Sequence, residues 1–169
     1  MNVPTEPWLH PDVDVRQSPI EGNGLFAATD LPEGVVVAAF GGTVVSDAEL
    51  AKLIDEADDY VDTPSIDVDQ NLVMPGRSNN GYGNHGCDPN LWWTDELLLT
   101  TRRAVAAGDE LLLDYGTITG DSGFGMPCEC GAQICRGEVT GRDWQIPALQ
   151  RAYGDHWSPA LRHRVREAT

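Results

Sequence analysis

The sequence predicts a mostly β fold with a few short helices. Short runs of β-branched residues and leucine, bounded by glycine or proline, recur at residues 35–40, 43–45, 97–100 and 110–113 and have the composition of strands. No long helical pattern alternates with these runs, so a parallel α/β sheet is not expected. The 169 residues contain no low-complexity tract, which indicates one domain with its own core.

The first fifteen residues are predicted to be extended or irregular, because prolines recur at positions 4, 7 and 11. Gly22–Ala27 (GNGLFA) formally matches the dinucleotide-binding fingerprint. That fingerprint requires a strand before it and a long helix after it, whereas Pro19 precedes it and Pro32 soon follows. A dinucleotide site is therefore excluded, and the residues alone indicate a β-turn between strands.

Three short helices are expected. Ser46-Asp-Ala-Glu49 is a capping box, and apolar residues follow it at helical spacing up to Ala57. Pro147–Gly154 has the proline start and glycine end of a second helix, and Ser158-Pro159 begins a third. Arginines concentrate in this C-terminal part, where we expect them to pack on the acidic body of the same chain.

The composition is strongly acidic, with 27 acidic and 11 basic residues and a formal charge of −16. This charge opposes direct binding to nucleic acid or to an anionic membrane and favours a basic partner, although acidity also serves solubility alone. Nine carboxylates and one lysine lie between positions 47 and 69, either as a solvated face or as a docking surface for a basic peptide. The first fifteen residues contain no apolar run, so we expect a cytoplasmic protein, or a nuclear one in a eukaryote.

The four cysteines predict a metal site. Two disulfides are the alternative, but the absence of a signal sequence and the short Cys128-x-Cys130 spacing favour zinc. Cys128, Cys130 and Cys135 supply three thiolates, and Cys87 is the only cysteine left for the fourth tetrahedral position. Four protein thiolates leave no position for water, so this zinc would be structural. A zinc deaminase is excluded because its C-x-x-C and H-x-E motifs do not occur.

One polar stretch, Asn84-His-Gly-Cys-Asp-Pro-Asn90, is a poor core element, because each of its residue types prefers a polar partner, a metal or a turn. Together with Asp114-Tyr115 and Cys128–Gly137 it resembles the SET-domain family of protein-lysine methyltransferases with a post-SET zinc motif. The resemblance implies a β-clip of small sheets with a knot-like C-terminal crossing. The implied parts are an extended segment at 1–17, the SET domain at 18–118, the post-SET segment at 119–140 and C-terminal helices at 141–169.

The same resemblance assigns the site residues. Tyr115 would be the catalytic residue, and Tyr60 would line the lysine channel. From the residues alone, packing is the more common role for a tyrosine placed as Tyr115 is, and a structural role fits Tyr60 equally well. The methyl donor, S-adenosylmethionine, would be held by Gly22, Asn23, Gly24, Leu25, Tyr82, Asn84 and His85. A role for His85 as general base is a weaker alternative. The zinc would pin residues 124–144 over the channel.

The implied activity is transfer of methyl groups from S-adenosylmethionine to lysine in a basic protein, histone-like or ribosomal. Three positions depart from the family pattern: Leu113 replaces an aromatic residue that influences how many methyl groups are added, Gly81 stands where arginine is usual, and Gly86 replaces a serine. These departures motivate a rival prediction, a catalytically silent zinc-stabilised module that binds basic tails.

Overall fold

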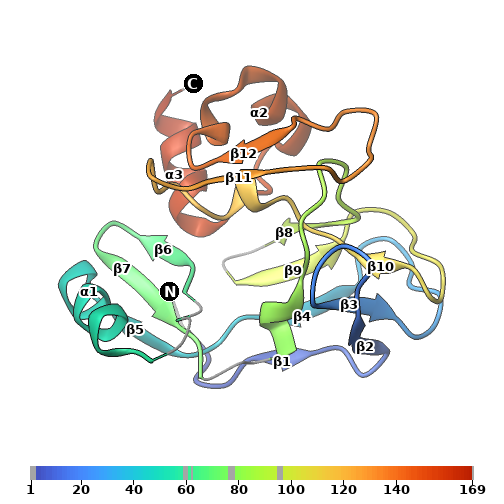
Figure 1. Ribbon diagram of the computed structural model, residues 1–169, viewed down its shortest axis with the longest axis horizontal. Helices are drawn as coiled ribbons and strands as arrows, with labels where there is room; N and C mark the ends of the chain where they lie inside the picture. The colour runs from blue at the N-terminus through green and yellow to red at the C-terminus, as the bar shows by residue number, and fades with distance from the viewer. Residues whose placement is uncertain (1–2, 59–60, 62, 76–78, 95–96, 169) are drawn as a thin grey trace.

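The computed structural model describes residues 3–58, 61, 63–75, 79–94 and 97–168. Within them the chain forms four small antiparallel sheets and three short α-helices, which confirms the mostly β prediction (Figure 1). The largest sheet has the strand order β1-β4-β9-β8, with bounds Trp8–Leu9, Val36–Ala39, Leu98–Thr101 and Leu91–Thr94. A second sheet has the order β10-β3-β2, with bounds Glu110–Leu111, Asn23–Ala27 and Val13–Gln17.

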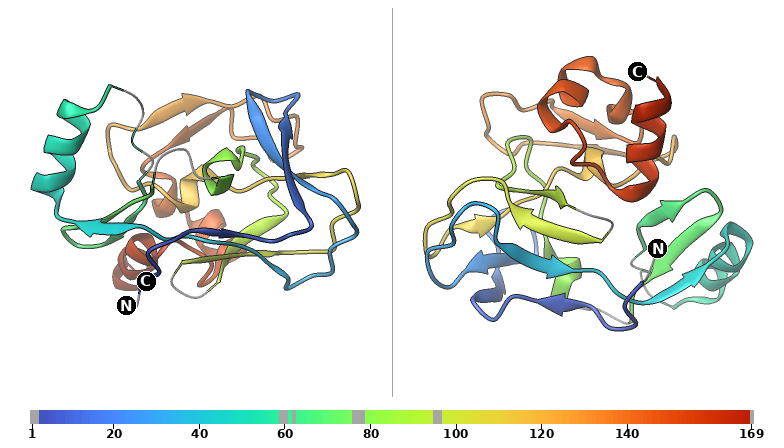
Figure 2. Two further views of the ribbon diagram at one scale, coloured as in Figure 1. Left: turned by 90° about the horizontal axis from the view of Figure 1, so that it is seen from below. Right: turned by 180° about the vertical axis from the view of Figure 1, so that it is seen from behind.

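One of the two remaining sheets is formed by the middle part of the chain and the other by its C-terminal part. One has the order β5-β7-β6, with bounds Thr43–Val45, Gln70–Val73 and Ser65–Asp67, and carries α1 (Figure 2). The other is the hairpin of β11 (Gly125–Pro127) and β12 (Glu138–Thr140), which lies beneath the C-terminal helices in Figure 1. The main core fills the space between the first two sheets and includes Leu25, Val37, Trp93, Leu99 and Leu111, each at most 1% exposed.

The N-terminal segment is more regular than its prolines predict. Trp8 pairs with Ala39, so β1 covers the edge of the largest sheet, and Val15 pairs with Leu25 in the β2–β3 hairpin. Val13 and Val15 alternate with polar residues, the spacing of a strand with one face on the core, and Val13 is buried. The prediction allowed extended or irregular structure: the extended alternative holds in β1 and β2, and the expectation that the segment lacks regular structure was wrong there.

All three predicted helices are present. Ser46 and Glu49 form the capping box at the start of α1 (Asp47–Glu56), which contains no buried residue. Gly154, at φ 54°, ends α2 (Pro147–Tyr153), and α3 (Pro159–Ala168) follows. Three single 3₁₀ turns complete the described structure: η1 (Asn79–Tyr82), η2 (Tyr115–Thr117) and η3 (Asp143–Gln145).

The C-terminal helices have a small core of their own, built from Tyr153, Trp157, Leu161 and Val165. They are joined to the rest of the molecule by hydrogen bonds from Ser158, whose N–H donates to the carbonyl of Thr117 and whose hydroxyl donates to that of Ile118. α2 and α3 are thereby held directly against η2. None of the described helices is long and apolar enough to cross a bilayer.

Replacing Leu111 with alanine is expected to lower the free energy of unfolding by about 2–5 kcal/mol, because its side chain is fully buried between β3 and the core. Urea denaturation followed by circular dichroism measures the change. Val68→Ala is the matched control, since Val68 is 88% exposed and its truncation should change stability by less than about 0.5 kcal/mol. Equal effects of the two substitutions would contradict this description of the core.

Candidate functional site

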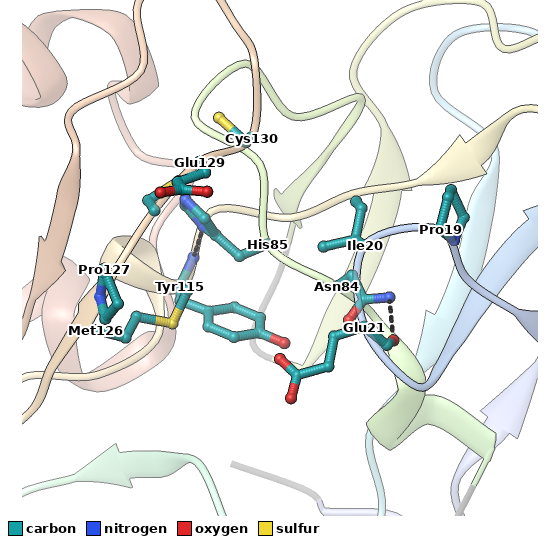
Figure 3. Close-up of a pocket in the computed structure, with 11 residues that line it drawn as sticks. Pro19, Ile20, Glu21, Asn84, His85, Tyr115, Met126, Pro127, Glu129 and Cys130 are labelled. Carbon is teal, nitrogen blue, oxygen red and sulfur yellow. Dashed lines mark hydrogen bonds between the residues drawn. The ribbon is translucent and has the colours of Figure 1, made fainter.

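A cavity lies where the polar stretch, the segment after β10 and the cysteine segment meet. It has a volume of about 620 Å³, and Figure 3 shows its walls: the loop before β3 on one side, the segment after β11 on the other, and Tyr115 between them. We call it the large cavity. Its lining residues are Pro19, Ile20, Glu21, Asn84, His85, Tyr115, Met126, Pro127, Cys128, Glu129 and Cys130.

Tyr115 is held at both ends. Its backbone N–H donates to His85 Nδ1 at 3.2 Å, and its hydroxyl donates to the carbonyl of Gly83 at 2.9 Å. Its ring also packs against the imidazole of His85, with centroids 5.4 Å apart. These contacts leave the side chain little rotational freedom, as a group that aligns reactants requires.

Tyr115 also lines a second, smaller cavity of about 110 Å³, which we call the small cavity. Its other lining residues are mostly apolar: Phe40, Thr63, Pro64, Gly81, Gly83, Trp93, Leu113 and Ile118. Two buried polar atoms in this wall, Trp93 Nε1 and Thr63 Oγ1, have no hydrogen-bond partner among the described residues. One tyrosine side chain is thus a shared wall of two cavities of different size and polarity.

His85 is buried, at 5% exposure, and both of its ring nitrogens are occupied. Nδ1 accepts from the Tyr115 N–H, so the ring proton is on Nε2, which lies 3.4 Å from Cys87 Sγ. Burial lowers the pKa of His85, which keeps the ring neutral near pH 7. The ring therefore connects Tyr115 to the cysteines, and this arrangement does not support a general base acting in the large cavity.

Asp114 is the fully buried carboxylate beside the site, and four donors reach it. Arg136 contributes two of them, with Nη2 to Oδ1 at 2.6 Å and Nη1 to Oδ2 at 2.8 Å. The hydroxyl of Tyr153 donates to Oδ2 at 2.8 Å and the N–H of Gly116 to Oδ1 at 2.9 Å. Burial, followed by the charge of Asp114, raises the pKa of Tyr153, so its hydroxyl remains a donor.

Arg136 links this carboxylate to two further parts of the molecule. Its Nε donates to Asp143 Oδ2 at 3.0 Å, at the start of the C-terminal segment. Its backbone N–H points at Cys87 Sγ, 3.4 Å away. A single arginine therefore joins Asp114 at the start of η2, the cysteine cluster and Asp143 in η3.

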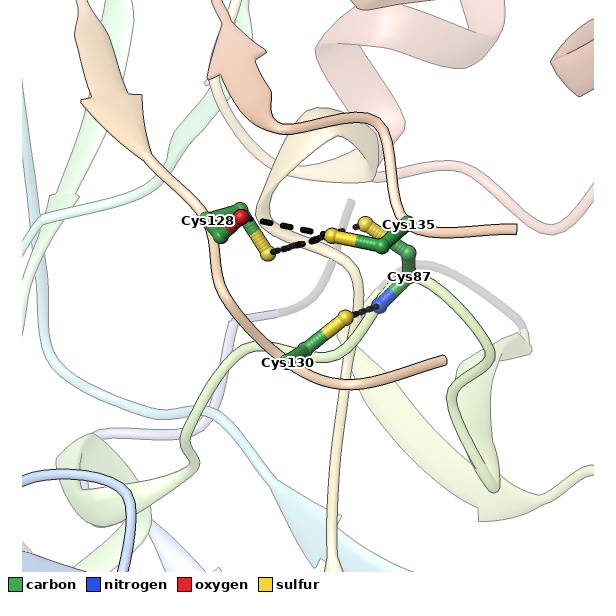
Figure 4. Close-up of side chains that lie close together, drawn as sticks. All are labelled: Cys87, Cys128, Cys130 and Cys135. Atoms are coloured by element: carbon green, nitrogen blue, oxygen red, sulfur yellow. Dashed lines mark hydrogen bonds between the residues drawn. The ribbon is translucent and has the colours of Figure 1, made fainter. Parts of the chain in front are cut away.

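The four cysteines converge, as Figure 4 shows, with all four sulfur atoms within 4.8 Å of one another. Cys87 Sγ lies 3.7 Å and Cys135 Sγ 3.8 Å from Cys128 Sγ, far longer than the roughly 2.05 Å of a disulfide. Zinc–thiolate bonds of about 2.3 Å in a tetrahedron place the sulfurs roughly 3.8 Å apart. The donor set and its spacing therefore fit a tetrahedral metal ion.

The electrostatics of the cluster also fit a cation. Burial raises the pKa of Cys87 and of Cys128, so these thiols resist ionisation without a positive charge nearby. At Cys130 burial is outweighed by hydrogen bonds from the N–H groups of Cys87 and Ala132, and the pKa is lowered. Such N–H···S contacts orient and stabilise thiolates around a metal ion.

The predicted donor-binding residues do not all reach the large cavity. Asn84 and His85 line it. Leu25 is instead a core residue at 1% exposure, and Tyr82 packs against the main core. Gly22, Asn23 and Gly24 are not among its lining residues, whereas Pro19, Ile20 and Glu21, earlier in the same loop, are. Tyr60 lies outside the described residues.

Several residues of the site carried no signal in the sequence. Pro19–Glu21 reach the cavity only because the β2–β3 hairpin places its loop there. Met126 and Glu129 could have been expected, since they neighbour cysteines whose convergence with Cys87 the sequence already predicted. Arg136 adjoins Cys135, but its ion pairs depend on contacts that no local pattern encodes.

Replacing Arg136 with methionine is expected to lower the free energy of unfolding by about 3–5 kcal/mol, because it leaves Asp114 charged, buried and without its cation. Arg151→Met, on the exposed face of α2, is the control and should change stability by less than about 0.5 kcal/mol. Guanidinium denaturation of protein purified without chelator measures both. The prediction fails if Arg136→Met is as stable as the control.

The SET domain family model matches residues 22–116, more than half of the 169 residues. The histone-lysine N-methyltransferase ash1 of Drosophila melanogaster is 26% identical over 152 residues, which cover 82% of this chain and 7% of that protein. Human histone-lysine N-methyltransferase 2D is 30% identical over 139 residues, covering 74% of this chain and 2% of that protein.

The solved structures show the same fold. The methyltransferase domain of human histone-lysine N-methyltransferase SETMAR superposes with a TM-score of 0.60 at 22% identity, covering 78% of this chain and 58% of that chain. The chain is thus much shorter than its curated relatives, spanning 7% and 2% of the two described above. On the match over residues 22–116, this chain belongs to the SET-domain family.

Proposed function

We propose that this chain is an S-adenosylmethionine-dependent protein-lysine N-methyltransferase. The observation that carries the proposal is the position of Tyr115 between the two cavities, with its hydroxyl fixed by Gly83. The donor would occupy the large cavity and the target amine the small one. The names of the similar proteins, all histone-lysine N-methyltransferases, support the same activity.

The reaction needs no acidic or basic catalyst from the protein. The donor supplies a methyl group on a sulfonium; the amine lone pair forms the new N–C bond as the C–S bond breaks, and its electron pair stays on sulfur. The chain's residues supply alignment, and Tyr115 is the group best placed to hold the amine and the methyl group in line. The methylated nitrogen then loses its proton to water.

The small cavity favours the neutral form of the amine. A free lysine has a pKa near 10.4, so only a small fraction is uncharged at pH 7. Phe40, Trp93 and Ile118 remove water from the amine, and desolvation lowers the pKa of a lysine. Desolvation in the small cavity thereby supplies the uncharged amine that a general base would otherwise have to produce.

The acidic segment at residues 47–69 favours a basic protein substrate, histone-like or ribosomal. Thr63 and Pro64 of this segment belong to the wall of the small cavity, so the acidic segment reaches the proposed amine site. A basic peptide lying along this segment would be attracted by its charge and would have a lysine within reach of the cavity. The formal charge of −16 acts in the same direction.

We further propose that the cysteine cluster binds one structural zinc ion. Cys128 and Cys130 are both ligands and lining residues of the large cavity, and Cys87 follows His85 by two positions. The ion would therefore hold one wall of the donor site in place while leaving no open coordination position for chemistry.

The departures from the family pattern do not by themselves favour the silent module. A Cβ atom at Gly86 would lie 3.0 Å from Leu112 Cδ1, and one at Gly83 would lie 2.7 Å from Leu113 Cδ2. Gly86 thus lacks a side chain because Leu112 fills its place, and Leu113 packs on Gly83. Calorimetry with S-adenosylmethionine distinguishes the hypotheses, because the silent module predicts no binding at high micromolar donor.

Tyr115→Phe is expected to reduce the rate of methyl transfer about 100-fold or more, since the hydroxyl that aligns the reacting groups is lost. Mass spectrometry of a panel of basic proteins incubated with S-adenosylmethionine measures the transfer. Donor affinity by calorimetry and the thermal midpoint should stay at the wild-type values, which shows that the fold and donor site are intact. Unchanged transfer would remove Tyr115 from the catalytic role.

Removal of the metal is expected to abolish donor binding, because Met126–Cys130 would no longer be held as a wall of the large cavity. The protein is treated with a chelator, its zinc content is measured by elemental analysis, and calorimetry is repeated. Adding one equivalent of zinc should restore affinity. A metal-free protein that binds the donor normally would disprove the coupling between the ion and the cavity.

A further inference from the structure

Glu110 is a half-buried carboxylate at the start of β10 that does not line either cavity. We propose that Glu110 is a positioning residue for the donor: it fixes the amide of Asn84 so that the carbonyl oxygen of that amide is offered to the large cavity as an acceptor. The inference rests on the proposed function, since it describes how the donor would be recognised there.

The hydrogen bonds of Asn84 determine which end of its amide faces inward. Nδ2 lies 2.8 Å from Glu110 Oε1, 3.1 Å from the carbonyl oxygen of Asn23 and 3.3 Å from that of Glu21, the last drawn in Figure 3. All three partners can only accept, so the atom facing them must be the NH₂ nitrogen. The two N–H groups are used up by these three acceptors.

Asn84 nevertheless lines the large cavity, so the group left for a ligand is its carbonyl oxygen, Oδ1. An acceptor at this place suits an N–H group, either an amino group on a heterocycle or an ammonium. S-adenosylmethionine carries both. A flipped amide would offer N–H donors instead and would repel the same groups.

Glu110 is itself fixed in place. The hydroxyl of Ser18 donates to Oε1 at 2.8 Å and to Oε2 at 3.0 Å, and the Asn90 amide donates to the Glu110 backbone carbonyl at 2.8 Å. Among the three acceptors of Asn84 Nδ2, the carboxylate is the shortest contact and the only charged one, and hydrogen bonds to charged groups are the stronger kind.

Gly24 gives independent support. A Cβ atom at Gly24 would overlap the Glu110 carboxylate and would lie 3.1 Å from Asn84 Nδ2. The absence of a side chain at this position therefore makes room for the Glu110–Asn84 pair. This accounts for the second glycine of the Gly22-x-Gly24 motif, which lies in β3 and is not among the lining residues of the large cavity.

The test compares Glu110→Met, which has a similar size but no acceptor, with Glu110→Gln, whose carbonyl can still accept from Asn84. Glu110→Met should weaken S-adenosylmethionine binding about 10-fold or more and raise the KM for the donor, while kcat at saturating donor is unchanged. Glu110→Gln should restore most of the affinity. A purely structural role would lower kcat and stability together and would not be rescued in this way.

Glu33→Met, in an exposed turn, is the matched control and should bind the donor as the wild type does. If Glu110→Met folds poorly, Ser18→Ala is used, and its loss of carboxylate support should raise the donor KM to an intermediate value. Wild-type affinity in Glu110→Met, or in Ser18→Ala where that replaces it, overturns the proposal.

The side-chain amide resonances of Asn84 in ¹⁵N-labelled protein provide a measurement that needs no donor. Slow hydrogen exchange in the wild type and fast exchange in Glu110→Met are expected, whereas fast exchange already in the wild type overturns the proposal. Wild-type protein that binds no donor but shows slow exchange would refute the proposed function while leaving the orientation of Asn84 intact.

Discussion

Asp114 is a buried carboxylate whose charge is matched by side chains from a later part of the chain. An unpaired charge at this depth would cost several kcal/mol, and Arg136 and Tyr153, both from the C-terminal third of the chain, supply the compensation. Because Asp114 immediately precedes Tyr115, the same contacts hold the tyrosine where the two cavities meet. Residues far apart in the sequence are thus held together because the buried charge of Asp114 needs hydrogen-bond donors.

The groups around Asp114 each make different contacts in the site. Tyr115 lies between a larger cavity of mixed polarity and a smaller, mostly apolar one, His85 joins it to Cys87, and Cys128 and Cys130 belong to the wall of the larger cavity.

Much of this arrangement could be predicted from the sequence, because metal ligands and helix caps have local signatures. The four cysteines converge as their count and spacing predicted, and the capping box at Ser46 begins a helix. The strands β1 and β2 were not predicted, because the prolines at positions 4, 7 and 11 favoured irregular structure there. β1 has only two residues, and in β2 the alternation is limited to Val13 and Val15. Glu110 and Arg136 could not be found, since their roles depend on partners 26 and 22 residues away. The knot-like crossing stays a prediction.

The distance along the chain between the cysteines has a consequence for biosynthesis. Cys87 and Cys128 are separated by 41 residues, and closing so large a loop is entropically costly until the β core has formed. During translation the last thiol emerges only after all the strands of the three larger sheets. The order of assembly would then be core first and cysteine cluster last, so a newly made chain would pass through a compact form in which the cavity wall that contains Cys128 and Cys130 has yet to form.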